Sequence, residues 1–474
     1  MAENFPPQEK KELSVEQTNI PGLLVVNMPV HADSRGWFKE NWQRAKMTKL
    51  GLPNFGPVQN NISYNSNKGT TRGIHTEPWD KYISVGSGKI FGAWVDMREG
   101  FEPNVFTIEM DASTAIFVPR GVGNSYQALE DGTVYTYLVN DHWTADGQYL
   151  SLNLADETAN INWPIPLDQA EVSEKDKNNP SLAEAGKVAP KKVLITGANG
   201  QLGVALQQYF PSADCVYLDT FNISDPTAYE RRKWNEYSAI INAAAYTNVD
   251  GAEMPEGREI SWQANAVAVS YLAIVAREHN ITLVHISSDY VFDGTKVPHK
   301  EDEKFSPLSV YGQSKAGGDI ATSLVPKHYL LRTSWVVGKG NNFVKTMKNL
   351  AEKGVDPSVV NDQLGRLTFT EDLAGAIDHL INNQKPYGTY NLTNTGSVVS
   401  WADIAKIVYE KTGNDPSRVT GVTTEEYYVG KTGVAPRPLL SEMDLTKIQE
   451  VGFTPRNWQD ALNEYIQELT QEKD

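Results

Sequence analysis

The sequence has a single cysteine, Cys215, so no intramolecular disulfide and no cysteine-based metal cluster can form. It has no run of about 18 apolar residues, the length that a membrane-spanning helix needs. The opening stretch MAENFPPQEKKELS carries no apolar secretion signal. Basic residues are also scarce: 43 Lys and Arg stand against 59 Asp and Glu, a formal net charge of −16. Because so acidic a chain is repelled by nucleic acid and by anionic membranes, we expect a soluble, cytoplasmic protein that binds neither.

What the sequence does contain indicates a multidomain globular protein. Its 474 residues correspond to two or three domains of about 150 residues. A polar, proline-punctuated stretch over 166–190 is predicted to be an exposed linker. Before it, over 1–165, short alternating runs between turn residues predict an all-β jelly roll of the cupin type. After it, over 191–474, strands alternate with helices, which predicts a Rossmann-type doubly wound parallel sheet with a small α/β cap from about Val359.

A glycine-rich turn opens the C-terminal part. Gly197-Ala-Asn-Gly200-Gln-Leu-Gly203 follows an apolar strand directly and precedes a helical pattern. Glycines at such a turn let the backbone approach a pyrophosphate, and the helix N-terminus offers amide donors. Asp219 ends the next strand, where a carboxylate can accept from a ribose hydroxyl. This pattern predicts a dinucleotide site.

A tyrosine and a lysine four residues apart follow downstream. Tyr311 and Lys315 share one face of a predicted helix, so the ammonium group is expected to lower the pKa of the phenol. Such a tyrosine can protonate a carbonyl oxygen as hydride reaches the carbon, with Ser288 of the stretch SSDYVFDG holding the same oxygen. The combination resembles the extended short-chain dehydrogenase/reductase superfamily.

Further motifs narrow this resemblance. NAAAYTNVDGAE (242–253), SSDYVFDG (287–294), VYGQSKAGGD (310–319) and RTSWVVG (332–338) occur in an order similar to that of dTDP-4-dehydrorhamnose reductase. The resemblance implies reduction of the C4 ketone of dTDP-4-dehydro-L-rhamnose, with Tyr290 and Trp335 lining the sugar pocket. The residues expected to bind the cofactor are Gly197, Asn199, Gly200, Gln201, Leu202, Gly203, Asp219, Ala243, Ala244, Ala245, Tyr311 and Lys315.

The cofactor and the assembly are less sharply indicated. Asp219 would repel a 2′-phosphate and so favours NADH, whereas the resembling reductases often prefer NADPH. We therefore predict NADPH with NADH tolerated. Some members of the family use Mg²⁺ at a dimer interface, but no residues for it can be located in this sequence. A homodimer is the expectation that both families suggest.

The N-terminal part resembles dTDP-4-dehydrorhamnose 3,5-epimerase. The stretches that carry the similarity are DSRGWFKE (33–40), QNNISYNSNKGTTRGIHTEP (59–78), FVPRGVGNSY (117–126) and YLVNDHW (137–143). The resemblance implies that His75 is the base, oriented by Asp156, that Tyr137 returns the proton and that Lys81 stabilises the enolate. It also implies a set of residues that hold the dTDP-sugar: Arg35, Phe38, Glu40, Gln59, Asn61, Arg72 and Asn124. No second histidine accompanies His75 in a metal-binding pattern, so we expect no metal there.

One departure leaves the function open. Where the family has a second active-site histidine this chain has Asn124, which can hydrogen-bond but cannot act as a base. The leading hypothesis is a bifunctional enzyme that epimerises and then reduces a dTDP-sugar. An alternative is a reductase whose N-terminal domain is inactive, or acts at a single carbon, and serves binding or dimerisation. A remoter alternative is a non-catalytic regulatory subunit.

Overall fold

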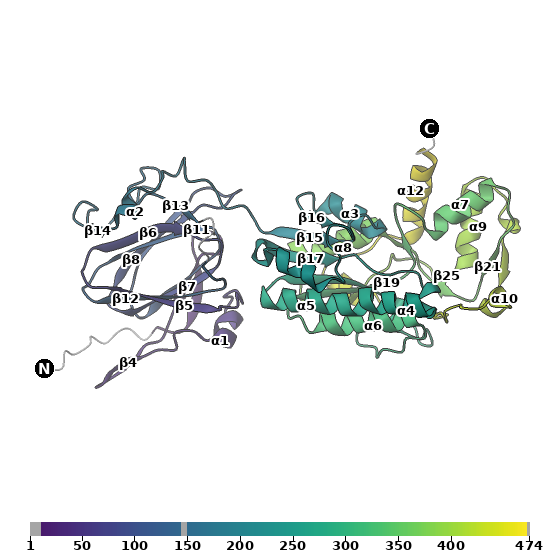
Figure 1. The fold of residues 1–474 in the computed structure, drawn as a ribbon, viewed down its shortest axis with the longest axis horizontal. Helices are drawn as coiled ribbons and strands as arrows, with labels where there is room; N and C mark the ends of the chain where they lie inside the picture. The colour runs from purple at the N-terminus through teal and green to yellow at the C-terminus, as the bar shows by residue number, and fades with distance from the viewer. Residues whose placement is uncertain (1–10, 144–148, 472–474) are drawn as a thin grey trace. The chain divides into compact units, whose positions relative to one another are not determined.

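The computed structural model of the chain describes residues 11–143 and 149–471 (Figure 1). The chain divides into two compact units, Met1–Pro190 and Lys191–Asp474. Within the described residues, no helix combines the length and the apolar character needed to cross a membrane.

Unit 1 is a sandwich of two β-sheets, which confirms the predicted jelly-roll class. One sheet has the order β1 (Ser14–Gln17), β2 (Leu24–Asn27), β10 (Thr114–Val118), β7 (Lys81–Ser87), β12 (Thr133–Val139) and β5 (Gln59–Asn65). The other has the order β13 (Leu150–Ser151), β6 (Thr70–Thr76), β11 (Val122–Ala128), β8 (Ile90–Asp96) and β9 (Val105–Met110). The two sheets bury a shared core that includes Ile83, Trp94, Ile116 and Tyr135. Alternation along each strand sends every second side chain into this core.

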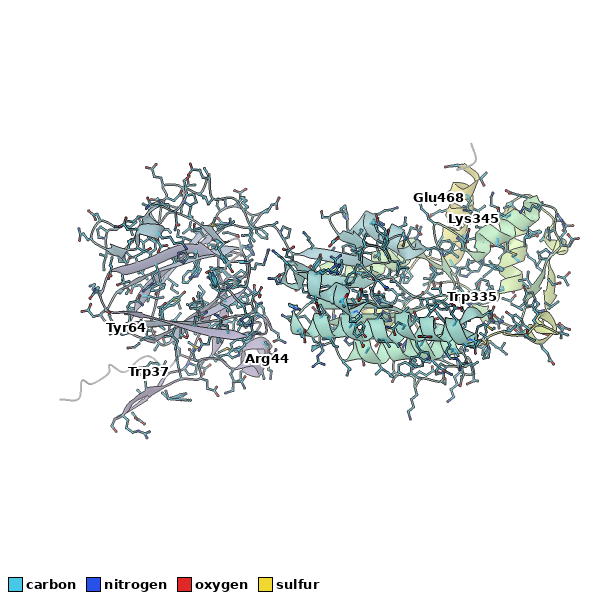
Figure 2. The ribbon with its side chains drawn as sticks, in the orientation of Figure 1. Trp37, Arg44, Tyr64, Trp335, Lys345 and Glu468 are labelled. Carbon is cyan, nitrogen blue, oxygen red and sulfur yellow. The ribbon has the colours of Figure 1, made fainter. Side chains whose placement is uncertain are left out.

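Two smaller elements flank the sandwich. Strands β3 (His31–Asp33) and β4 (Gly36–Phe38) pair as a separate hairpin, which projects from the body of the unit in Figure 1. Helix α1 (Arg44–Lys49) follows it and buries Met47. Figure 2 shows Trp37 on this hairpin and Tyr64 on β5.

The stretch 166–190, predicted to be an exposed linker, is part of unit 1. Strand β14 (Glu171–Val172) pairs in parallel with β6, and helix α2 (Glu174–Lys177) follows it. Leu182 and Ala185 pack into a cluster with Ile74 and Val95. The prediction was wrong because the apolar residues of this stretch stand singly among charges, so no helical or strand period reveals that they are buried.

Unit 2 is a Rossmann-type α/β fold, as predicted. Its six strands are all parallel, in the order β16 (Asp214–Val216), β15 (Lys192–Thr196), β17 (Tyr237–Asn242), β18 (Thr282–Ser288), β19 (His328–Thr333) and β24 (Gly388–Asn391). The order reverses between β15 and β17. Ligands bind at the carboxyl edge of such a switch point.

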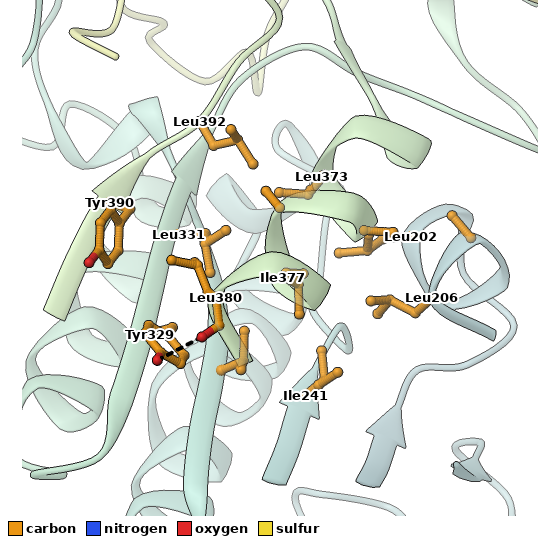
Figure 3. Close-up of a cluster of buried hydrophobic side chains, with 14 of the residues drawn as sticks. Leu202, Leu206, Ile241, Tyr329, Leu331, Leu373, Ile377, Leu380, Tyr390 and Leu392 are labelled. Atoms are coloured by element: carbon orange, nitrogen blue, oxygen red, sulfur yellow. Dashed lines mark hydrogen bonds between the residues drawn. The ribbon is translucent and has the colours of Figure 1, made fainter. Parts of the chain in front are cut away.

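Helices cover both faces of this sheet (Figure 1). Helices α3 (Gln201–Tyr209) and α8 (Thr370–Asn382) lie on one face, and α4 (Pro255–Trp262), α5 (Ala268–Glu278) and α6 (Val310–Ser323) lie on the other. Figure 3 shows the first interface, where Leu202 and Leu206 of α3 meet Ile377 of α8 above Ile241 of the sheet. There the hydroxyl of Tyr329 donates to the carbonyl of Leu380 at 2.9 Å.

The cap has its own core. It gathers α7 (Phe343–Glu352), α9 (Trp401–Lys411) and α12 (Trp458–Gln471) around the buried Trp458. Val337 and Val344 belong to this core, so the cap begins earlier in the chain than the predicted Val359. Short strand pairs and a helix complete it: β20 (Val336–Val337) with β23 (Thr368–Phe369), β21 (Ser358–Val360) with β26 (Thr420–Val422), β22 (Leu364–Gly365) with β25 (Val399–Ser400), and α10 (Thr424–Tyr428). Helix α11 (Thr446–Glu450) instead packs against the parallel sheet, where Ile448 joins its core.

Candidate active sites

The glycine turn of unit 2 lies at the switch point of the sheet. Gly197 has φ +64°, and a Cβ there would come within 2.7 Å of the Ala244 backbone. A Cβ at Gly203 would collide with the carbonyl of Gly197. Gly200 caps α3 without a side-chain hydrogen bond, so the first amide groups of the helix stay available. Only bare backbone fits here, which is the surface that a pyrophosphate requires.

The remaining predicted cofactor residues surround this turn unequally. Asn199 is exposed in the turn, and Ala243, Ala244 and Ala245 follow β17 directly. Leu202 is instead a core residue between α3 and the sheet, and Gln201 donates to the carbonyl of Asn341 at 3.1 Å. Leu202 therefore offers a ligand no more than its backbone.

Asp219, predicted to end the strand, lies in the loop after β16, which ends at Val216, and is exposed. It lines a hollow of about 500 Å³ together with Arg231, Arg232 and Lys233. Arg232 is paired with Asp214 at 2.7 Å. Sequence reasoning found no arginine beside Asp219 because these basic residues stand at least twelve positions downstream. Their cluster RRK was the signal that could have been used.

Ser288, Tyr311 and Lys315 come together at the ends of β18 and α6. Ser309 caps α6 by accepting from the amide of Gly312 at 3.1 Å, which places Tyr311 in the first turn and Lys315 one turn later. Tyr311 is hydrogen-bonded to Ser288. Lys315 Nζ donates to the carbonyl of Ile286 at 2.6 Å.

Burial governs the ionisation of this group. It raises the pKa of Tyr311 above its usual range, and it lowers the pKa of Lys315 to about 8. In the protein without ligands, Lys315 therefore does not lower the pKa of Tyr311 as the sequence predicted. Removing water penalises both charged forms, and the ammonium is turned toward a backbone carbonyl.

A buried carboxylate that the sequence analysis did not single out supports the serine. Asp289 accepts from Ser288 Oγ at 2.8 Å and from Ser441 Oγ at 2.5 Å. Burial raises the pKa of Asp289. Asp289 thus links the end of β18 to Ser441, about 150 positions further along the chain. Its place inside SSDYVFDG was the available signal.

The two predicted sugar-pocket residues of unit 2 differ in their surroundings. The ring of Tyr290 lies edge-on to Tyr311 with centroids 5.4 Å apart. Trp335 instead stacks on Trp401 at 3.9 Å, and Figure 2 places it between the sheet and the helices of the cap. Trp335 has φ +48°, a conformation that non-glycine residues seldom adopt and that often marks functional positions. Tyr290 thus lies beside Tyr311, and Trp335 packs against Trp401 of the cap.

In unit 1, His75 is paired with a carboxylate from outside the sandwich strands. His75 Nε2 lies 2.8 Å from Oδ1 of Asp176, which belongs to α2. The side chain of Asp176 is only 6% exposed, against 39% for His75. Burial by itself raises the pKa of Asp176, but the hydrogen bond from His75 and its partial charge outweigh burial and bring the pKa below its usual value.

Asp156, predicted to orient His75, has another role. Its carboxylate accepts from the amides of Ala159 at 2.8 Å and of Leu182 at 2.7 Å. These bonds engage both carboxylate oxygens in fastening the segment after β13, and the hydrogen bond of His75 goes to Asp176 instead. The prediction of an Asp156–His75 pair was wrong because several aspartates follow the last long strand, and nothing local in the sequence distinguishes the one that meets His75.

The other predicted groups of unit 1 come from both sheets. His75 and Asn124 are register partners on β6 and β11. From the facing sheet, Lys81 Nζ lies 6.0 Å from the ring centroid of Tyr137. Lys81 is also paired with Glu77, which the sequence did not single out as a site residue. A base, a phenol, an ammonium and a carboxylate thus face one interior.

The predicted diphosphate-binding residues form a polar rim. Gln59 Nε2 donates to Asn61 Oδ1 at 2.8 Å, and Asn61 is the register partner of Tyr137. Arg72 Nε donates to Asn65 Oδ1 at 3.1 Å. That bond orients the guanidinium of Arg72, an exposed residue of the type that binds phosphates.

Three predicted substrate residues lie apart from this group. Arg35 is paired with Asp33 on the hairpin β3–β4, Phe38 is 65% exposed, and Glu40 is paired with Lys46. The structure does not bring them to His75. Their roles stay predictions.

Metal binding finds no support in the described part of the chain. Over 11–143 and 149–471, no three His, Cys, Asp or Glu side chains gather as a metal site would require. The predicted use of Mg²⁺ therefore has no residues assigned to it.

These features first define a class. A switch-point glycine turn with a Ser–Tyr–Lys group is the arrangement of the short-chain dehydrogenases/reductases, and here it is joined to a jelly roll with an acid–base interior. Known families match both parts. Residues 191–471 match the model of the RmlD substrate binding domain, and residues 17–184 match that of dTDP-4-dehydrorhamnose 3,5-epimerase.

Individual relatives agree with both matches. A dTDP-4-dehydrorhamnose reductase of Aggregatibacter actinomycetemcomitans is 38% identical over 301 residues, which covers 57% of this chain and 97% of the relative. An RmlC homolog of Streptococcus pyogenes is 49% identical over 184 residues, which covers 37% of this chain and 92% of the relative. The crystal structure of a dTDP-4-dehydrorhamnose reductase of Bacillus anthracis in complex with NADP has a TM-score of 0.54 at 34% identity and covers 59% of this chain and 99% of that one.

The chain therefore belongs to the dTDP-4-dehydrorhamnose reductase family through unit 2 and to the dTDP-4-dehydrorhamnose 3,5-epimerase family through unit 1. Both are families of enzymes.

Proposed function

We propose that the chain is a bifunctional enzyme of dTDP-L-rhamnose synthesis. Unit 1 would epimerise C3 and C5 of dTDP-4-dehydro-6-deoxy-D-glucose, and unit 2 would reduce the C4 ketone of the product with NADPH. The observation that carries the proposal is that one chain holds two complete acid–base groups. They are His75–Asp176 opposite Tyr137 and Lys81 in unit 1, and Ser288–Tyr311–Lys315 in unit 2.

In unit 1, His75 acts as the base. Asp176 accepts the Nε2 proton, so Nδ1 is the free nitrogen that takes a proton from the carbon next to the C4 ketone. The electrons of the broken C–H bond move onto the C4 oxygen, beside which Lys81 supplies positive charge. Tyr137 then protonates the carbon from the opposite face of the ring, and the ketone re-forms with inverted configuration.

In unit 2, the residues present fit a nicotinamide dinucleotide. The bare turn Gly197–Gly203 and the open N-terminus of α3 suit its pyrophosphate, and Asp219 suits a ribose hydroxyl. When bound, the cofactor supplies the hydride. Tyr311 gives its proton to the C4 oxygen, Ser288 holds that oxygen in line, and Lys315 favours the phenolate that remains. Burial of Tyr311 and Lys315 keeps water away from these steps.

The fusion itself supports a sequence of two reactions. Joining the two sites in one chain raises the concentration of the epimerised ketone near the reductase. Reduction then draws the epimerisation forward. A homodimer and tolerance of NADH are part of the proposal.

The test is proton exchange followed by reduction. Purified protein with dTDP-4-dehydro-6-deoxy-D-glucose in D₂O, without nicotinamide, should exchange the C3 and C5 hydrogens as observed by NMR. His75→Ala should slow this exchange by about 10²–10⁴-fold. Added NADPH should then give dTDP-L-rhamnose, and Tyr311→Phe should block only that step.

The two variants control each other, because each should spare the other reaction. Tyr329→Phe adds a matched control for Tyr311→Phe, since it removes a buried hydroxyl that donates to a backbone carbonyl of α8 and not to the Ser288–Tyr311–Lys315 group. If the wild type exchanges neither carbon, unit 1 is a silent domain and the bifunctional proposal is wrong.

One observation favours the alternative of a reductase with a reduced or inactive N-terminal domain. Asn124 occupies the position of a second histidine and cannot take a proton at neutral pH. Exchange at a single carbon would support this alternative. A purely regulatory role is opposed by the complete Ser288–Tyr311–Lys315 group.

A further inference from the structure

Asn124 has a buried partner that fixes its orientation. Tyr135 Oη donates to Asn124 Oδ1 at 3.2 Å. Tyr135 is 2% exposed, and its ring stacks on Tyr126 with centroids 4.1 Å apart and planes 13° from parallel. A ring packed this tightly has one accessible position, so its hydroxyl is a fixed point for the amide.

The direction of this bond decides which end of the amide faces the site. Across the described residues, Asn124 is the one hydrogen-bond partner of Tyr135 Oη, so the phenol must donate there to place its proton. Burial raises the pKa of Tyr135, which keeps that proton in place. With Oδ1 held by Tyr135, the Asn124 NH₂ group is turned the other way. No protein acceptor contacts it within residues 11–143 and 149–471.

The free NH₂ group lies beside the base. Asn124 and His75 are direct register partners on neighbouring antiparallel strands, whose facing side chains are about 5 Å apart at Cβ. If His75 removes the protons of both C3 and C5, each of these carbons must lie near His75 in turn. A donor fixed beside His75 then lies near C4 in both steps. C4 is the one ring carbon bonded to both C3 and C5, and its oxygen carries the developing negative charge.

We propose that Tyr135 is a positioning residue that holds Asn124 as a hydrogen-bond donor to the C4 oxygen during epimerisation. Asn124 would then act beside Lys81, whose charge is shared with Glu77. In this view the asparagine replaces a histidine without loss of function, because the position supplies a donor and His75 supplies the base. This inference rests on the proposed epimerase activity of unit 1.

The experiment compares exchange rates at C3 and C5 in D₂O without nicotinamide. Asn124→Ala removes the donor and should lower kcat for exchange by about 10²-fold at both carbons, as loss of one oxyanion donor does elsewhere. Tyr135→Phe leaves the donor but frees its rotation, and should lower kcat by about 5–10-fold with KM little changed. Because neither residue titrates near neutrality, the pH profile should keep its shape.

The double variant separates positioning from a general loss of structure. Tyr135→Phe in the Asn124→Ala background should add no further loss, since the hydroxyl then has nothing to hold. Tyr82→Phe is the matched control: Tyr82 is fully buried in unit 1, and its hydroxyl contacts Met28 Sδ at 3.3 Å, away from the interior group. It should leave exchange unchanged.

Other outcomes would overturn the inference. The inference fails if the fold-losses in kcat of the two single variants multiply in the double variant. It also fails if Tyr135→Phe and Tyr82→Phe exchange at equal rates, because either result would show that Tyr135 does not act through Asn124. Loss at one carbon with Tyr135→Phe but none with Asn124→Ala would make Tyr135 itself an acid. A wild type without exchange would remove the proposed activity together with this inference, whereas a wild type that exchanges leaves the variants to decide the inference alone.

Discussion

The two units assemble their reactive groups in opposite ways. In unit 1 they come from β6, β7, β11 and β12 and from helix α2, which lies about 100 positions after His75 in the chain. In unit 2, Tyr311 and Lys315 occupy successive turns of α6 beside the end of β18. One site is distributed over the fold, and the other is almost local.

Their charges are balanced differently as well. In unit 1 the imidazole of His75 is paired with Asp176 and the ammonium of Lys81 with Glu77, and the His75 side chain is 39% exposed. In unit 2, Lys315 is buried against a carbonyl, and its pKa falls to about 8. An epimerase must exchange protons with its surroundings, whereas hydride transfer benefits from a site that excludes water. The contrast therefore matches the two proposed reactions.

The largest expected effect tests the distributed site. Asp176→Asn keeps the shape of the side chain but removes the charge that holds the His75 tautomer. We expect exchange at C3 and C5 to fall by about 10²–10⁴-fold, the range found when the aspartate of a catalytic His–Asp pair is replaced. NMR exchange in D₂O measures it.

Asp156→Asn is the matched control for this prediction. Its carboxylate binds two backbone amides, so we expect a loss of about 1–2 kcal/mol in the free energy of unfolding and nearly normal exchange. The reverse ranking, with Asp156→Asn inactive and Asp176→Asn active, would contradict the observed pairing and restore the prediction from sequence.

This pair of aspartates shows where sequence reasoning succeeds and where it stops. The glycine turn and the Tyr311–Lys315 spacing are local patterns, because a turn or a single helix fixes their geometry. The two fold classes followed from periodicity for the same reason. Asp176 could not be chosen over Asp156, because only the packing of 166–190 onto β6 decides which aspartate meets His75. Tyr135 and Glu77 were missed because a strand pattern shows that a residue faces inward but not what it meets there.

A smaller effect tests the dehydrated site. Lys315→Met places an apolar chain of similar length where burial opposes the ammonium. One pKa unit corresponds to about 1.4 kcal/mol, so a pKa of about 8 instead of 10.5 implies that the variant gains about 3–4 kcal/mol in the free energy of unfolding near pH 7. Reduction should be lost, which makes this a trade of stability for activity.

The pH dependence gives this prediction its sign. Between about pH 8 and 10.5 the unfolded chain holds a proton on Lys315 that the folded protein has released, so the stability of the wild type rises with pH. Lys315→Met has no such rise. Measured by denaturant unfolding, the difference in the free energy of unfolding between Lys315→Met and the wild type should therefore be largest at pH 7 and shrink toward pH 10. If Lys315→Met is less stable than the wild type at pH 7, or if the difference in stability does not change with pH, the buried ammonium of Lys315 does not destabilise the folded protein as we infer.

The smallest effect concerns Asp219, an exposed residue of the unit 2 site. Asp219 shares its hollow with Arg231 and Lys233, so a 2′-phosphate there would meet charges of both signs. Asp219→Asn removes the repulsion and weakens the acceptor for a ribose hydroxyl. We expect Kd for NADPH to fall about fivefold and Kd for NADH to rise, because an exposed charge pair is worth about 1 kcal/mol. Fluorescence titration with each cofactor measures both Kd values, and added salt should reduce the effect on NADPH.

Asp225→Asn is the control for this prediction, since its carboxylate in the same hollow is already bound to Thr227. Equal changes for the two cofactors would mean that Asp219 does not face the ribose, and the exposed edge of unit 2 would then take no part in choosing between them.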